Sequence, residues 1–145
     1  MIQFLIQLLI GLIGGVAGGL QAPFAGIMGQ KTDDLTSVFI TYVGGAIAVT
    51  AITLVVGGGQ LSEWRTIPWY AFLAGPLGLV IVGSLSYTVP RLGAATATTV
   101  FVLAWLGFSA VIDHFGWFNV PMRPLDLSRG AGLLALILGT WLVVR

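Results

Sequence analysis

Long runs of uncharged, mostly apolar residues alternate with short polar breaks along the whole chain. Between Leu35 and Ile112 the only charged residues are Glu63, Arg65 and Arg91. A helix needs about 20 mostly apolar residues to cross the ~30 Å hydrocarbon core of a bilayer, and the breaks leave stretches of about that length. This pattern predicts an all-α integral membrane protein, a single transmembrane domain over residues 1–145. The five expected helices cover residues 2–28, 36–56, 68–89, 92–112 and 128–144.

Turn signals separate the expected helices. They are the polar segment 30–34, the glycine run 57–59, a short turn at Pro90-Arg91 and a longer loop over 113–127. Pro23 lies inside the first apolar stretch and predicts a kink there. Lys31 is the first charged residue, so the first stretch lacks the positive start and short core of a secretory signal. We therefore expect a retained first helix.

Composition agrees with a bilayer environment and excludes several classes of function. Apolar residues make up 57% of the chain and charged residues 8%, against about 25% charged in ordinary globular domains. No cysteine is present, and His114 is the only histidine, so we expect neither a metal site nor another cofactor. The net charge of +1 and the lack of a basic run predict no nucleic-acid partner. The expected first partner is the lipid bilayer itself.

The basic residues give no preferred orientation in the membrane. Lysine and arginine in short loops normally favour the cytoplasmic side. With five helices the loops divide three basic residues against three, namely Arg65, Arg123 and Arg129 against Lys31, Arg91 and Arg145. Either another feature sets the orientation, or the chain inserts both ways and forms an antiparallel homodimer or pairs with a homologous chain of opposite orientation. Such a pair has the inverted symmetry of alternating-access transporters.

Four segments resemble a known family. They are Gln21-Ala22-Pro23, SVFITYVGG (Ser37–Gly45), VPRLGAATATTV (Val89–Val100) and VIDHFGWFNVPMRPLDLSR (Val111–Arg129). In order and spacing they are similar to the YdcZ-like small transporters of the drug/metabolite transporter (DMT) superfamily, over essentially the whole chain. The DHFGW stretch is the most specific part.

The resemblance implies an EamA/DMT-like half-transporter of the bacterial inner membrane, with five helices and a dimeric working form. It also implies that the two chains of the dimer have opposite orientations. Two positions depart from the family pattern: Ala25 replaces a usual asparagine, and Ala104-Trp105 replaces a common Gly-Gln pair. If those side chains touch substrate, this chain's specificity differs, or the chain is one half of an unequal pair.

Polar and aromatic side chains inside the expected helices are candidates for a substrate path. No ionisable group lies at central depth, so coupling through a membrane carboxylate has no support. Gln21 either bonds the carbonyl freed by Pro23 or lines the path, because a buried amide is costly without hydrogen bonds. Trp105 either packs between helices or lines the same cavity. The substrate-binding candidates are Gln21, Tyr42, Tyr87 and Trp105, with Thr41, Ser84 and Ser86 as further polar groups.

Small residues at four-residue spacing predict close helix packing, within one chain or across a dimer. Such faces let backbones approach closely in lipid. The positions are Gly11, Gly15 and Gly19 in the first helix, and Gly93 and Ala97 near the start of the fourth.

Three boundary residues have two interpretations each. Arg91 either anchors its turn to lipid phosphates or guards a pore mouth. Asp113 and His114 either have a structural role, capping the fourth helix or neutralising Arg123 or Arg129, or they gate transport, since histidine titrates near neutral pH.

The sequence therefore predicts a membrane transporter that moves a small organic solute, as an antiparallel dimer, by alternating access. We expect no enzyme, because these helices offer no converging nucleophile, base or metal ligand. We expect no direct use of ATP, because the phosphate-binding motif G-x-x-x-x-G-K-[ST] is missing. The alternative is an accessory membrane subunit that stabilises another complex and transports nothing.

Overall fold

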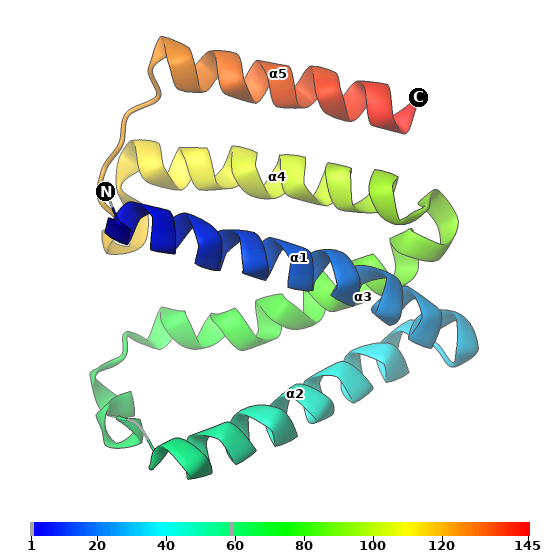
Figure 1. Ribbon diagram of the computed structural model, residues 1–145, viewed down its shortest axis with the longest axis vertical. Helices are drawn as coiled ribbons and strands as arrows, with labels where there is room; N and C mark the ends of the chain where they lie inside the picture. The colour runs from blue at the N-terminus through cyan, green and yellow to red at the C-terminus, as the bar shows by residue number, and fades with distance from the viewer. Residues whose placement is uncertain (1, 59) are drawn as a thin grey trace. The chain divides into compact units, whose positions relative to one another are not determined.

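The computed structural model describes residues 2–58 and 60–145, and helices dominate this part of the chain (Figure 1). The α-helices are α1 (Ile2–Lys31), α2 (Asp34–Val56), α3 (Ala74–Leu92), α4 (Ala94–Phe115) and α5 (Leu127–Val144). Short 3-10 helices are η1 (Leu61–Thr66), η2 (Trp69–Leu73) and η3 (Trp117–Asn119). Among the described residues, five helices are long and apolar enough to cross a membrane, with η2 continuing into α3 as one span. The predicted fold class, an all-helical protein with five membrane-spanning helices, is confirmed.

The third span begins differently from the prediction. Residues from Pro68 were expected to be α-helical, but Trp69–Leu73 forms a 3-10 helix and α3 starts at Ala74. Pro76 suits this boundary, because proline is tolerated best in the first turn of an α-helix, where its missing N–H would have no helical partner anyway. The chain therefore changes from 3-10 to α-helix just before this proline.

The predicted turn at Pro90-Arg91 is wrong. Both residues lie inside the last turn of α3, which ends at Leu92. The break falls at Gly93, whose backbone angles are φ +82° and ψ 153°. Residues with a Cβ rarely adopt this conformation, whereas glycine adopts it readily. Because proline has no N–H, Pro90 cannot donate the usual hydrogen bond to the carbonyl four residues earlier in α3.

Residues 1–91 form one compact unit and residues 92–145 another. In the first unit, the core consists of Ala25 from α1, Val38 from α2 and Val82 from α3. A buried hydrogen bond joins α2 to α1, from the Ser37 hydroxyl to the carbonyl of Ala25 at 2.9 Å. Small side chains therefore bring these helices together, as expected where lipid supplies no hydrophobic force between helices.

Both ends of α2 have side-chain or glycine caps. Asp33 accepts hydrogen bonds from the backbone N–H of Thr36 at 2.9 Å and from its hydroxyl at 2.6 Å. These bonds satisfy a free donor of the first turn. Gly57, with φ +90°, ends the helix in the left-handed region.

The second unit consists of α4, α5 and the loop between them. Gly116 ends α4 with φ +64°, and Asp126 starts α5 by accepting a hydrogen bond from the Arg129 N–H at 2.8 Å. The prediction of a single domain over the whole chain stays a prediction.

Candidate functional site

A groove in the first unit brings together two of the predicted substrate-binding residues. Its volume is about 400 Å³, within the range of small-molecule sites. Its walls come from α1, α2 and α3, and the lining residues are Gln21, Thr41, Tyr42, Gly45, Ala46, Val49 and Val82. A neighbouring groove of about 470 Å³ between α1 and α2 shares Gln21, Thr41 and Gly45 with it. The two grooves therefore meet at Gln21 and Thr41.

The Gln21 side chain is exposed in the described unit, and its amide makes no hydrogen bond with the described residues. The bond to the carbonyl freed by Pro23, which was one of the two sequence interpretations, is not formed. An amide at this depth needs partners, because an unpaired amide is costly in hydrocarbon. Its role in a substrate path stays a prediction.

Tyr42 reaches from α2 across to α3. Its hydroxyl lies directly over Gly78, in the space where any other residue would carry a Cβ. The side chain is 36% exposed, so one side of the ring is open to the groove. Gly78 therefore determines where the phenol sits, a relationship that the sequence pattern did not reveal.

Tyr87 does not line this groove and instead contacts Arg91. The Arg91 guanidinium carbon lies 3.6 Å from the Tyr87 ring centroid, and Nη1 donates a hydrogen bond to the Tyr87 carbonyl at 2.6 Å. A cation over an aromatic face is attracted by the ring quadrupole. One residue predicted to bind substrate and one predicted to gate thus form a pair on a single helix.

Arg91 also borders a polar pocket of about 440 Å³ where α1 ends and α2 begins. Asp33, Asp34 and Ser86 line the same pocket. The Ser86 hydroxyl is buried and donates to the Asp34 carboxylate at 2.8 Å. The Thr36 hydroxyl and N–H hydrogen bonds hold the pKa of Asp33 below its usual range. This end of the unit therefore carries a carboxylate pair beside a guanidinium.

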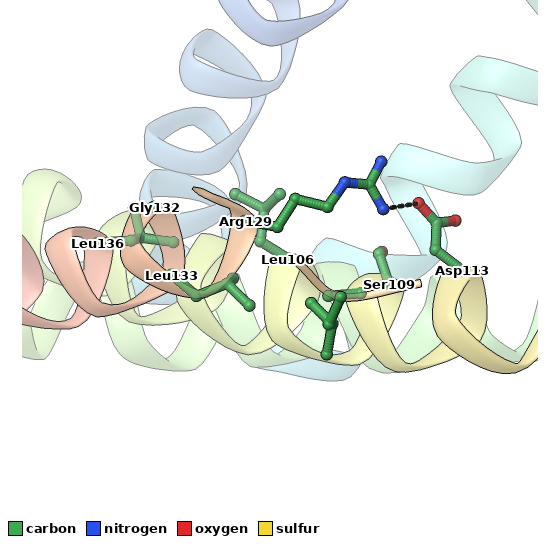
Figure 2. A pocket seen from close by; sticks show the side chains of 9 residues that line it. Leu106, Ser109, Asp113, Arg129, Gly132, Leu133 and Leu136 are labelled. Atoms are coloured by element: carbon green, nitrogen blue, oxygen red, sulfur yellow. Dashed lines mark ion pairs between the residues drawn. The ribbon is translucent and has the colours of Figure 1, made fainter. Parts of the chain in front are cut away.

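The second unit contains a groove between α4 and α5, shown in Figure 2, of about 360 Å³. Its apolar lining includes Leu106 from α4 and Leu133 and Leu136 from α5. At its polar end the Arg129 side chain extends from α5 toward α4, where Nη1 lies 3.7 Å from Asp113 Oδ2 (Figure 2). The prediction that Asp113 neutralises Arg129 is confirmed. Gating by Asp113 stays a prediction.

His114 fastens the loop between α4 and α5. Its Nδ1 accepts a hydrogen bond from the backbone N–H of Leu125 at 3.0 Å. The Asp113 carbonyl accepts another from the Arg123 N–H at 2.7 Å, and Arg129 donates to the Arg123 carbonyl at 3.0 Å. These contacts give His114 a structural task, whereas its predicted gating stays a prediction.

Trp105 lies in the second unit, apart from the groove that Gln21 and Tyr42 share. It is 61% exposed and meets the edge of Phe101 at a centroid distance of 5.4 Å. Its predicted place in a common cavity is therefore untested.

The glycine positions differ in their surroundings. Among the described residues of the first unit, nothing lies within 4 Å of a Cβ built on Gly11, Gly15 or Gly19. Ala97 is buried, and Gly93 lies outside α4 in its own backbone conformation. Packing across a dimer stays a prediction for the α1 glycines.

Comparison with protein families identifies the family of the chain. Residues 6–142 match the family described as "Putative inner membrane exporter, YdcZ". The chain belongs to the YdcZ family. Searches of curated proteins and of solved structures found no match. As a YdcZ protein, with five helices able to span a bilayer, the chain is an inner-membrane protein of an exporter family and contacts lipid.

The structure places Ala25, one of the positions where the resemblance implied a departure. Ala25 is 1% exposed and lies in the helix core, where its carbonyl accepts the Ser37 hydroxyl. It lines neither of the grooves that contain Gln21. A longer polar side chain at this position would have to reach out from between the helices. Ala25 therefore contributes to the packing of α1 against α2 and not to the lining of either groove.

Proposed function

We propose that two oppositely inserted chains form an exporter that moves a small organic solute by alternating access. The observation that carries this proposal is Gln21, an amide in a membrane-spanning helix that has no partner among the described residues. Lipid cannot satisfy an amide, so its side chain needs a second chain, a solute or water in a cavity. A dimer with a central cavity provides all three.

The distribution of basic residues supports opposite insertion. Three basic residues lie on each side of a five-helix chain, so the loop charges favour neither orientation. Two copies related by a two-fold axis in the membrane plane reproduce the inverted repeats of many transporters. Each copy then contributes one groove to the shared passage. A homologous chain of opposite orientation would serve equally well as the second half.

We also propose that the protein is not an enzyme. The two grooves that contain Gln21 are lined by an amide, hydroxyls that include the Tyr42 phenol, and apolar groups, without a carboxylate, imidazole, amine or thiol beside them. General acid–base or covalent catalysis requires such groups within hydrogen-bond reach of each other. Binding and release of a solute require none of them.

Two measurements test the proposal. Reporters that are active on only one side of the membrane are fused to the C-terminus, and opposite insertion predicts activity of both. Purified protein in liposomes should release a trapped organic solute faster than protein-free liposomes. Activity of a single reporter contradicts dual insertion. Lack of flux together with one stoichiometric unrelated companion in the purified sample would favour an accessory subunit.

A further inference from the structure

Thr41 carries a buried hydroxyl without a hydrogen-bond partner. Among the described residues it is the only buried side-chain oxygen or nitrogen in this state. Four threonines of the described helices behave differently, each donating to the carbonyl four residues earlier at 2.7–2.8 Å: Thr53, Thr88, Thr99 and Thr140. A fifth, Thr36, donates to the Asp33 carboxylate.

This contrast is informative because threonine in a membrane helix can satisfy itself through its own backbone. Thr41 has the same option and does not use it. A buried hydroxyl without a partner is costly in an interior of low polarity. Such orphan groups are rare in native structures, and each calls for a specific explanation.

The surroundings of Thr41 point to a ligand. It lines both grooves of the first unit, and Gln21 lines both with it. Tyr42, the next residue, adds a phenol to one of them. The other lining groups are apolar or glycine, and neither groove includes a charged side chain. The hydroxyl therefore belongs to a small polar cluster on otherwise apolar walls.

We infer that Thr41 is the hydrogen-bonding anchor of the substrate groove, and that the solute is uncharged, with an apolar body and a hydroxyl, carbonyl or amide group. This inference rests on the proposed exporter function and names its substrate class. An ionised solute in these grooves would lose its hydration without gaining a countercharge. A neutral polar group, in contrast, is matched by a hydroxyl that both donates and accepts. A lipid tail would leave Thr41 as unpaired as it is now.

The test uses four probes of similar size: benzamide and benzyl alcohol as neutral solutes, benzylammonium and benzoate as charged ones. Binding to the purified full chain is followed by thermal shift. The variants are Thr41→Val, which removes the hydroxyl at nearly constant volume, and Thr41→Ser, which retains it. Thr53→Val is the matched control, because the Thr53 hydroxyl already bonds its own helix on the same α2.

The neutral probes should stabilise the wild type, Thr41→Ser and Thr53→Val more than the charged probes do. Thr41→Val should bind the neutral probes about tenfold more weakly, as expected for one lost hydrogen bond. Without probe, Thr41→Val should melt no lower than the wild type, because the lost hydroxyl has no partner. That last readout separates a binding role from a structural one.

Three results would overturn the inference: equal binding of neutral probes by Thr41→Val and wild type, stronger binding of the charged probes, or no binding of either neutral probe. Stabilisation by added phospholipid alone would assign the groove to lipid and also overturn it. Liposome flux keeps the two proposals apart. If the wild type transports a solute that Thr41→Val transports equally well, the exporter stands and the anchor fails. If neutral probes bind through Thr41 without flux, the exporter fails and the binding site stands.

Discussion

The Ser37 hydroxyl of α2 donates a hydrogen bond to the backbone carbonyl of Ala25 in α1 at 2.9 Å, and both residues are buried. The bond lies beside the core of the first unit, close to Val38 in sequence. A polar contact of this kind fixes the register of two helices, which apolar packing alone specifies weakly in lipid. Thr41 lies one helical turn further along α2 and lines the groove with Gln21 of α1, so the relative position of these two residues depends on that register.

Replacing Ser37 by alanine should lower the free energy of unfolding by roughly 1 kcal/mol, the usual value for a hydrogen bond between membrane helices. The loss stays modest because the Ala25 carbonyl lies inside α1 and keeps the backbone hydrogen bond of its own helix. Unfolding of the purified chain in mixed detergent micelles measures it. Ser84→Ala is the control, since Ser84 is exposed and bonds only the Ile81 carbonyl of its own helix. Equal effects of the two variants would contradict the interpretation.

A second prediction concerns Gly29, where α1 meets the Ser86–Asp34 hydrogen bond. A Cβ at this position would collide with the Ser86 hydroxyl and lie 2.9 Å from Asp34 Oδ1. Gly29→Ala should therefore destabilise the unit by about 1–3 kcal/mol, the range for overpacked sites.

Gly14→Ala serves as the control on the same helix. Open space surrounds Gly14 within the described unit, and alanine favours helix by up to about 1 kcal/mol. This variant should be neutral or slightly stabilising when its melting temperature in detergent is compared with that of Gly29→Ala. A Gly29→Ala protein as stable as the control would show that the collision is relieved without cost.

The spans were predictable from the sequence because hydrocarbon thickness alone sets their length. Their ends were less predictable, since Pro76 and Gly93 act through backbone sterics that apolar patterning ignores. Gln21 and Tyr42 were predicted and line one groove. The contact between Tyr87 and Arg91 was not predicted, because the two residues were assigned different roles although they lie one helical turn apart on α3. The unbonded hydroxyl of Thr41 was not predictable either, because the side-chain rotamer determines whether a threonine hydroxyl bonds its own helix.

Asp33 gives the α2 cap a predictable pH dependence. The Thr36 hydroxyl and N–H bond the carboxylate, so its pKa is lower in the folded protein than the ~3.9 of an unfolded chain. Its stabilising effect is therefore present above about pH 4 and is lost as the pH falls through the lower folded pKa. Asparagine caps helices about as well but does not titrate.

Comparing wild type with Asp33→Asn from pH 6 to pH 3 isolates this effect. The wild type should be more stable at pH 6, and its advantage in unfolding free energy should shrink as the carboxylate becomes protonated. A difference that stays constant over this range would mean that the charge of Asp33 does not contribute.

The loop after α4 should depend on the ring nitrogen of His114. Because Nδ1 accepts the Leu125 N–H at 3.0 Å, the ring carries its proton on Nε2. His114→Phe keeps an aromatic ring but removes the acceptor, so the Leu125 amide should exchange about fivefold faster with deuterated water, for a loss of ~1 kcal/mol. His114→Asn offers an amide oxygen near the position of Nδ1 and should restore part of the protection. Unchanged exchange in His114→Phe would show that this bond does not hold the loop.

The last prediction concerns the open face of α1. Gly11, Gly15 and Gly19 repeat every fourth residue, and the described unit leaves space above each. If a second chain packs there, Gly15→Leu forces the two backbones apart and should weaken the dimer at least tenfold, or about 1.4 kcal/mol. Light scattering of the purified protein across a dilution series measures the change in dimer affinity.

Ile13→Phe enlarges a side chain on the other side of the same helix segment, where Ile13 is 68% exposed. This control should leave the dimer intact, because its side chain faces away from the glycine ladder. Equal weakening by both variants would point to general damage to α1. If neither variant weakens the dimer, the glycines face lipid and another surface must join the chains. Only selective weakening by Gly15→Leu would assign the glycine ladder to the interface of the proposed dimer.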